Sequence, residues 1–217
     1  MHVAFTIIIA LLGLAVGSFL NVLIGRLPIM LENSAQAQCA EFLNKPHPKI
    51  KRFNLAWPGS HCPSCEHSLV WWMNIPLISF MVLRARCHFC KASIGWRYPV
   101  VELLSMLLAL GLFCHFGMTV AFGASLIFTW GLIALFFIDL DTMILPDEVT
   151  LGLLWIGLLV NVSGTFVSLQ SAVIGAVAGY VFFYAVFWLF KWVTKKEGLG
   201  YGDFKLFAAC GAWLGWQ

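Results

Sequence analysis

The sequence predicts an all-α polytopic membrane protein with about six transmembrane helices, the last one incomplete, and a zinc-binding cytoplasmic loop domain between the first two helices. Three observations lead to this class. Of the 217 residues, 61% are hydrophobic and only 11% are charged, and the mean hydropathy is +0.89. Long stretches contain no charged residue, and two cysteine pairs lie in the largest charged region. A soluble domain of this length is far less apolar, so that class is excluded.

The expected helices follow from four stretches without Asp, Glu, Lys or Arg, namely residues 1–25, 103–138, 149–190 and 206–217. About 20 apolar residues cross a bilayer as a helix, so the second and third stretches are each long enough for two helices. Polar segments at His115–Gly117 and Asn161–Thr165 divide them. We therefore expect helices near residues 3–24, 98–115, 119–138, 149–166 and 171–190, with a sixth beginning after Asp203.

The first apolar stretch has two interpretations, a cleaved signal peptide and a retained transmembrane helix. Its core is long, no basic segment precedes it, and residues 21–28 do not resemble a small-residue cleavage site. A retained helix is therefore the better interpretation.

The charged residues predict the topology. They fall in residues 26–102, 139–148 and 191–205, which all lie on one side if five helices cross the membrane. The first region holds nine of the 13 basic residues: Arg26, Lys45, Lys49, Lys51, Arg52, Arg84, Arg86, Lys91 and Arg97. The positive-inside rule makes this side cytoplasmic, in contact with membrane lipid, and nothing in the pattern indicates nucleic-acid binding.

Three parts follow from this layout. Residues 1–25 form the first transmembrane helix, residues 26–97 the cytoplasmic loop domain, and residues 98–217 the transmembrane core. The last apolar segment ends about 14 residues after Asp203, short of the roughly 20 needed to span. We therefore expect the core to be truncated at its C-terminus.

Four cysteines in the loop domain have the spacing of a metal site. Cys62 and Cys65 form one CxxC pair, and Cys87 and Cys90 form a second pair after 21 intervening residues. Two such pairs can supply four thiolates to one tetrahedral zinc ion, and a saturated site of this kind is structural. Disulfides and free thiols are the alternatives, but the reducing cytoplasm disfavours disulfides.

Asp139 is the first candidate catalytic residue, because it directly follows an expected apolar helix, where desolvating a carboxylate is costly. Asp141 would point away from it. Asp147 precedes the next apolar stretch and is interpreted as its N-cap.

Asp203 is the second candidate, because Gly198, Gly200 and Gly202 precede it and allow the backbone to bend closely. The alternative is a flexible loop whose Asp203 caps the next helix. Lys205 could pair with either candidate or anchor the interface. Two carboxylates close together in a poorly hydrated site share a proton, so one can act as base and the other as acid, as in an aspartic protease.

Seven ordered motifs resemble the type IV prepilin peptidase family, the GxGD membrane aspartic proteases, over essentially the whole chain. They are Gly17–Val22 with Arg26–Pro28, Cys62–Cys65, Asn74–Pro76, Cys87–Cys90, Arg97–Leu103, Asp139–Asp141 with Leu145–Asp147, and Gly200–Asp203.

This resemblance places the catalytic aspartates at Asp139 and Asp203, on the cytoplasmic side of a bacterial inner membrane. It implies that the protein cleaves the short basic leader of type IV prepilins or type II secretion pseudopilins. It also implies methylation of the new N-terminus with S-adenosylmethionine, for which the sequence contains no glycine-rich nucleotide loop. A presenilin-like protease and a non-enzymatic zinc-loop scaffold are the competing hypotheses.

Overall fold

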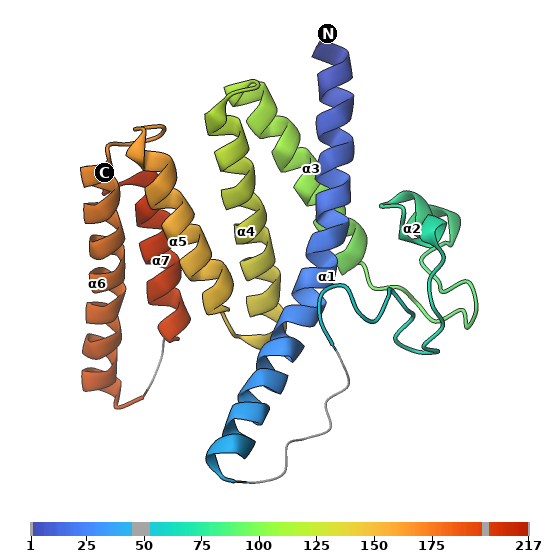
Figure 1. Cartoon of the computed structure of the whole chain (residues 1–217), viewed down its shortest axis with the longest axis horizontal. Coiled ribbons are helices and arrows are strands. Elements are labelled where there is room, and N and C mark those ends of the chain that lie inside the picture. Colours follow the sequence, from blue (N-terminus) through green and yellow to red (C-terminus); the bar gives the residue numbers. More distant parts are fainter. Residues whose placement is uncertain (1, 45–52, 197–199, 217) are drawn as a thin grey trace. The chain divides into compact units, whose positions relative to one another are not determined.

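A computed structural model describes residues 2–44, 53–196 and 200–216 of the chain (Figure 1). Within these ranges all regular elements are helices, and two isolated β-bridges are the only extended pairings. Five residues used in the sequence analysis lie outside the described residues: Lys45, Lys49, Lys51, Arg52 and Gly198. The chain divides into two compact units, residues 1–115 and residues 116–217, and each is described by itself.

Four described helices are long and apolar enough to cross a membrane: α1 (His2–Phe42), α3 (Arg97–Phe116), α4 (Val120–Thr142) and α6 (Leu169–Thr194). The two other long helices, α5 (Asp147–Val162) and α7 (Tyr201–Leu214), have 16 and 14 residues. They are shorter than the roughly 20 residues that span a bilayer. The predicted all-helical membrane class is confirmed, with four helices that meet the length of a span.

α1 continues well beyond the predicted end near residue 24 and finishes at Phe42. The helix includes Pro28, which cannot donate to the preceding turn and usually bends a helix. Figure 1 shows that the axis of α1 changes direction along its length. After Pro28 the sequence is rich in Ala, Glu and Gln, which favour helix without being apolar enough for the bilayer core. The apolar stretch ends where the composition changes, but the helix continues because the residues that follow have high helix propensity.

In the first unit, α1 packs closely against α3 through two glycines. A Cβ at Gly13 would lie 2.7 Å from Met106 Cα, and one at Gly17 would lie 2.7 Å from Glu102 Cα. Ser105 Oγ donates a hydrogen bond of 2.7 Å to the carbonyl oxygen of Gly13. Small residues four apart and interhelical hydrogen bonds are the usual means of joining helices in lipid, where the hydrophobic effect between helices is absent.

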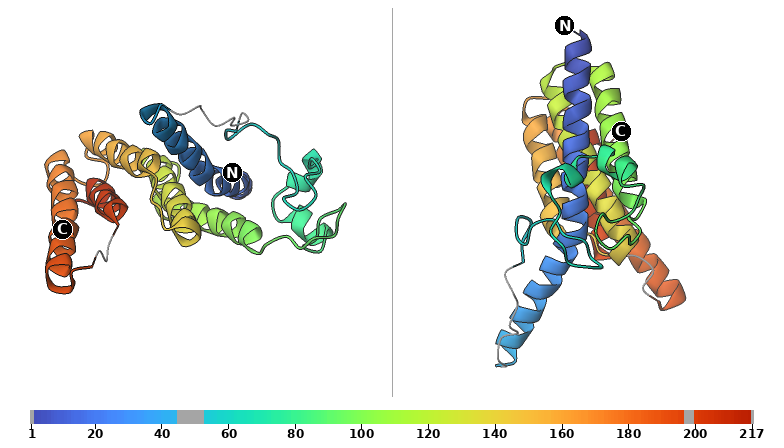
Figure 2. Two further views of the ribbon diagram at one scale, coloured as in Figure 1. Left: turned by 90° about the horizontal axis from the view of Figure 1, so that it is seen from below. Right: turned by 90° about the vertical axis from the view of Figure 1, so that its right-hand side faces the viewer.

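In the second unit, α6 and α7 lie side by side in the views of Figures 1 and 2. A Cβ at Gly179 of α6 would lie 2.6 Å from the carbonyl oxygen of Phe207 on α7. The fully buried ring of Phe204 packs on the rings of Tyr180, Tyr184 and Phe187. These contacts fix the face of α7 that meets α6.

The opposite side of α7 packs on α5. Trp213 Nε1 donates to the carbonyl oxygen of Leu153 at 2.8 Å, and Asn161 Nδ2 donates to that of Ala212 at 2.9 Å. All four residues are buried. A buried amide or indole N–H in a membrane protein must find a partner within the protein, so these bonds fix how α7 sits along α5.

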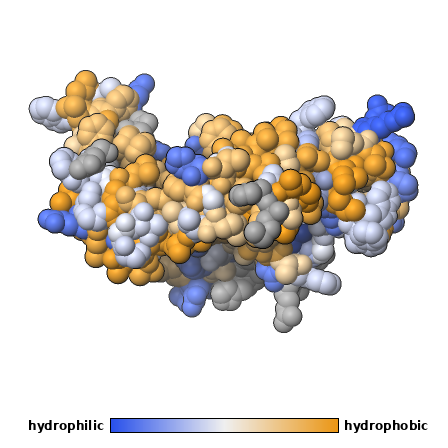
Figure 3. Space-filling view, turned by 90° about the horizontal axis from the view of Figure 1, so that it is seen from above, coloured by the Kyte–Doolittle hydropathy of each residue, from blue (hydrophilic) through white to orange (hydrophobic). Residues whose placement is uncertain are grey.

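Much of the remaining helix surface is apolar. Figure 3 shows hydrophobic side chains over most of the face in view, with hydrophilic groups gathered in smaller areas. Leu159, Phe182 and Leu189 are each more than 60% exposed. Lipid tails would cover such side chains in a helix that crosses a membrane.

Candidate active site and metal centre

Asp139 lies in the last turn of α4, because the helix continues to Thr142 and not to residue 138 as predicted. Met143 ends the helix in the left-handed conformation, and its N–H donates to the carbonyl oxygen of Asp139 at 2.8 Å. The carboxylate of Asp139 is exposed and makes no hydrogen bond or ion pair with another described residue. It is therefore accessible to water and to a substrate.

Asp203 is the third residue of α7 and not a residue before the helix. Its Oδ2 accepts a hydrogen bond of 3.0 Å from the N–H of Gly200, which precedes the helix. The side chain is half-buried. The N-terminus of a helix stabilises a carboxylate through its free N–H groups and its dipole. The alternative of Asp203 as the N-cap is wrong, because Gly200 holds that position; Asp203 instead takes part in a capping box as the third helical residue, which leaves its Oδ1 for other partners.

Gly202 brings the beginning of α7 against the connection between α4 and α5. A Cβ at this position would lie 2.6 Å from Cβ of Leu145, whereas a Cβ at Gly200 would meet nothing closer than Asp203 Oδ2 at 3.5 Å. Only one of these two glycines is needed for close approach. The turn that carries Asp203 consequently lies beside the segment that follows Asp139.

The helices that carry the two acids pack on the same hydrophobic cluster. Leu135 of α4 forms this cluster with Leu153 and Ala209, and Leu206 of α7 packs against it. Asp139 follows Leu135 by four residues on the same face of α4, and Asp203 precedes Leu206 by three residues on the same face of α7. Leu145, which follows Asp139 in the chain, contacts Gly202, which directly precedes Asp203. The C-terminal end of α4 and the N-terminal end of α7 therefore lie at the same end of the second unit.

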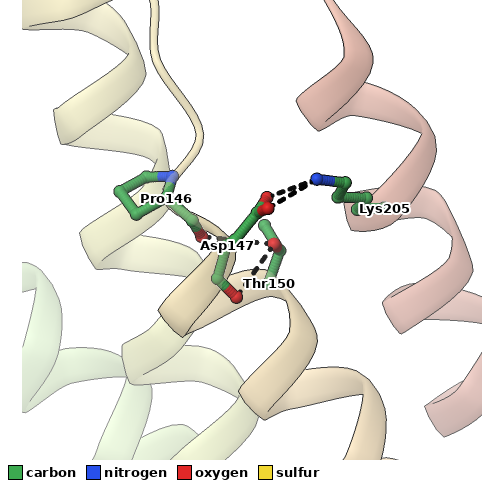
Figure 4. Close-up of polar contacts among 4 residues, drawn as sticks. All are labelled: Pro146, Asp147, Thr150 and Lys205. Atoms are coloured by element: carbon green, nitrogen blue, oxygen red, sulfur yellow. Dashed lines mark hydrogen bonds and ion pairs between the residues drawn. The ribbon is translucent and has the colours of Figure 1, made fainter. Parts of the chain in front are cut away.

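An ion pair joins Asp147 to Lys205 (Figure 4). Lys205 Nζ lies 2.6 Å from both carboxylate oxygens. The prediction that Asp147 is an N-cap is wrong, because Pro146 holds that position and Asp147 is the first helical residue. The buried hydroxyl of Thr150 instead donates to the carbonyl oxygen of Pro146 at 3.2 Å. The sequence allowed Lys205 to pair with Asp139 or Asp203 or to anchor the interface, and its observed partner is a third acid, Asp147.

In the first unit, the four predicted metal-binding cysteines come together. The sulfur atoms of Cys62, Cys65, Cys87 and Cys90 all lie within 4.8 Å of one another, and those of Cys62 and Cys90 are 3.8 Å apart. A tetrahedral zinc ion with bonds of about 2.3 Å requires sulfur atoms about 3.8 Å apart. The arrangement fits a structural metal site with four thiolates.

The two cysteine pairs sit in backbone turns that repeat at an offset of 25 residues. The N–H of Cys62 donates to His67 O, and the N–H of Cys87 donates to Ala92 O. Each turn is closed by an isolated bridge, between His61 and Ser68 and between Arg86 and Ser93. Glu66 and Lys91, at matching positions, both have positive φ angles.

The backbone of the first turn also favours a thiolate. The N–H groups of Ser64 and Cys65 lower the pKa of the Cys62 thiol from 9.0 to about 6. The N–H of His67 acts in the same direction on Cys65, but burial and the three neighbouring thiols together raise the pKa of Cys65 to about 11. Four thiols this close cannot all ionise without a cation among them.

Two family models match the chain, and their ranges follow the two units. Residues 11–116 match the bacterial peptidase A24 N-terminal domain, and residues 126–217 match the type IV leader peptidase family. A protein of Stutzerimonas stutzeri is 54% identical over 215 residues, which are 99% of this chain and 74% of that protein. The chain belongs to the type IV leader peptidase family.

Other relatives agree with this assignment. A protein of Pseudomonas aeruginosa is 53% identical over 99% of this chain and 74% of its own length, and one of Aeromonas hydrophila is 52% identical over 97% and 73%. All three are named prepilin leader peptidase/N-methyltransferase. No solved structure matches the chain. Within the family, the leader peptidase model covers both candidate acids, and the N-terminal model covers all four cysteines.

Several features of this leader peptidase family member carried no local signal in the sequence. The ion pair between Asp147 and Lys205 joins residues 58 positions apart. The contact of Gly202 with Leu145 and the shared cluster of Leu135 and Leu206 are also long-range. The repeat of the cysteine turns could have been found from the sequence, because Ser68 and Ser93 follow their cysteine pairs at the same distance.

Proposed function

We propose that this membrane protein is an aspartic endopeptidase that removes the short basic leader of type IV prepilins or type II pseudopilins and then methylates the new N-terminus. The names of relatives that are about half identical over nearly the whole chain support both activities. The observation that supports the peptidase most directly is the position of Asp139 and Asp203, each one turn beyond the same hydrophobic cluster.

In the proposed mechanism, the two carboxylates hold one water molecule between them and share one proton. The ionised carboxylate removes a proton from the water, which attacks the scissile carbonyl carbon, while the protonated carboxyl donates to the carbonyl oxygen. The resulting tetrahedral intermediate loses the amine, which takes up the proton that the first carboxylate removed from water, while the second carboxylate recovers its proton from the intermediate's hydroxyl as the new carboxyl group forms. Water is the nucleophile, so no acyl-enzyme forms.

The surroundings of Asp139 suit a basic leader. Asp141 and Glu148 are exposed close to it in the sequence, and no basic residue lies between residues 139 and 148. Negative potential at a site attracts a positively charged substrate segment. Lys205 neutralises Asp147 in this region, so Asp147 adds little to this attraction.

We further propose that the catalytic end and the cysteine loop face the cytoplasm at a bacterial inner membrane. The concentration of basic residues in the loop supports this orientation. The metal that we propose for the four cysteines is zinc, which would hold the two turns together and take no part in the reaction. The proposed methyl donor, S-adenosylmethionine, rests on the names of the relatives, and no described residue is assigned to it.

The test uses the purified chain reconstituted in lipid vesicles with two substrates, a prepilin and an unrelated transmembrane helix without a basic leader. We expect cleavage of the prepilin at its leader junction, and methylation of the product when S-adenosylmethionine is added. Cleavage of both substrates at similar rates would indicate a general intramembrane protease. No cleavage of either would contradict the proposal.

A further inference from the structure

The loop domain contains an apolar surface that neither the peptidase chemistry nor the cysteine site uses. Helix α2 (Ile78–Val82) connects the two cysteine turns and has no buried residue. Met81 and Val82 are each 67% exposed, and Trp96, just before α3, is 72% exposed. Large apolar side chains gathered on an exposed surface mark a site of contact with another apolar phase.

A hydrogen bond ties this helix to a membrane-spanning element. The N–H of Leu77, the residue before α2, donates to Oε2 of Glu102 at 2.9 Å. Glu102 is 8% exposed and lies five residues into α3, roughly 7.5 Å along its axis. Figures 1 and 2 show α2 beside the N-terminal end of α3. The beginning of α2 is therefore held level with the second turn of a helix that crosses the bilayer.

A groove of about 400 Å³ lies between α2 and the beginning of α3. Phe80, Met81, Trp96 and Pro99 contribute apolar walls, and Arg84 adds the apolar part of its side chain. The rings of Phe80 and Trp96 pack together with centroids 5.0 Å apart. An apolar groove with the exposed Arg84 at its edge matches the chemistry of an acyl chain whose phosphate lies outside the groove.

The charge around the groove selects among possible occupants. Residues 69–101 contain four basic residues and no acid, the adjoining Glu102 is buried, and Arg84, Arg86 and Lys91 are exposed. A basic prepilin leader would be repelled here, and the same surface of a second copy would place like charges together. Anionic lipid headgroups attract such a surface.

We propose that α2 is an interfacial helix that enters the headgroup layer where α3 begins, and that its groove holds an acyl chain of an anionic phospholipid whose phosphate lies at Arg84. Tryptophan at such a level is the usual interfacial anchor. The lipid would fix the cysteine loop at the membrane surface. This inference depends on α3 crossing the membrane and not on the proposed peptidase activity.

The test replaces Met81 in the full chain with the photo-crosslinking residue p-benzoylphenylalanine and reconstitutes the protein in phosphatidylethanolamine vesicles with phosphatidylglycerol. The matched control carries the same probe at Gln38, an exposed residue of α1 about 18 Å beyond Arg26. We expect phosphatidylglycerol adducts at Met81 in at least about fivefold excess over the control. Adding Arg84→Glu should reduce the phosphatidylglycerol adducts at Met81 by about fivefold or more, because that cation contacts the phosphate.

Three outcomes would overturn the proposal. They are a yield at Met81 equal to that at Gln38, crosslinks to an added prepilin, and crosslinks to a second copy of the chain. Circular dichroism of each variant confirms that the helices are retained. A wild-type chain that cleaves no prepilin, while the Met81 variant still forms the lipid adduct, would count against the proposed function alone.

Discussion

Lys205 Nζ lies 2.6 Å from both carboxylate oxygens of Asp147, and this ion pair joins the beginning of α7 to the first turn of α5. The side chain of Lys205 is 31% exposed and that of Asp147 is 53% exposed. Solvent screens such a pair, so its contribution to stability is about 1 kcal/mol or less. Its position is more important than its strength, because Lys205 is two residues from Asp203. The pair holds the turn that carries a candidate catalytic acid.

We expect Lys205→Met to lower prepilin cleavage on the order of 10-fold, because small displacements of a catalytic group are costly. Lys205→Arg should retain most of the activity, since it can still pair with Asp147. The measurement is the initial rate of leader removal, together with thermal unfolding. A Lys205→Met enzyme with unchanged kcat would show that the pair does not position Asp203.

Asp139→Asn and Asp203→Asn should each abolish leader cleavage while leaving membrane insertion intact. Asn at position 203 can still accept the hydrogen bond from Gly200, so the loss would be chemical and not structural. Glu148→Gln is the comparison variant, because Glu148 is exposed at the same end of the unit and should affect only the attraction of the leader, so cleavage is retained with at most a raised KM. Full cleavage by either Asp variant would exclude the two-aspartate mechanism.

Gly202→Ala should destabilise the protein by about 1–3 kcal/mol or displace the turn that carries Asp203, because the new methyl group overlaps Leu145. Gly200→Ala is the control, since its Cβ has ordinary contacts and the residue has a φ of −79°. Thermal unfolding and the cleavage rate are measured for both variants. Adding Leu145→Gly, which removes the overlapping Cβ, to Gly202→Ala should restore part of the loss. Equal behaviour of the two glycine variants would contradict the predicted overlap.

The protein should contain about one zinc ion per chain when it is purified without chelator. Cys62→Ser and Cys87→Ser should each lose the metal, whereas Cys114→Ser, outside the cluster, should keep it. The measurement is the zinc content of the three variants and of the wild-type protein by elemental analysis. A wild-type protein without metal would contradict the proposed zinc site.

Acid should release the metal, because the ligands are thiolates and protons compete for them. The lowered pKa of Cys62 keeps its thiolate available well below the ordinary value of 9.0, and this contribution is lost as the pH falls through about 6. We therefore expect retention of zinc at pH 7 and release as the pH falls below about 6, measured with a zinc-sensitive dye. Release that becomes greater as the pH rises from 6 to 8 would have the wrong sign.

The sequence determined much of the class and the chemistry. Uncharged stretches predicted the helical membrane class, and the structure has helices in each of the expected regions. The spacing of the two CxxC pairs predicted that four thiols meet, which the structure confirms. These signals are local or periodic, so a reader of the chain can recognise them without knowing how the helices pack. The roles of Asp139 and Asp203 stay predictions.

Tertiary packing decided the rest. Asp147 pairs with a lysine on α7 instead of capping its own helix. The hydrogen bond from Leu77 to Glu102 likewise joins a loop to a membrane helix 25 residues away. Such pairings depend on which helix faces meet, and the facing residues are distant in the chain. Side-chain type alone does not specify a partner, because the free energy of a polar contact depends on its burial and on the neighbour that packing provides.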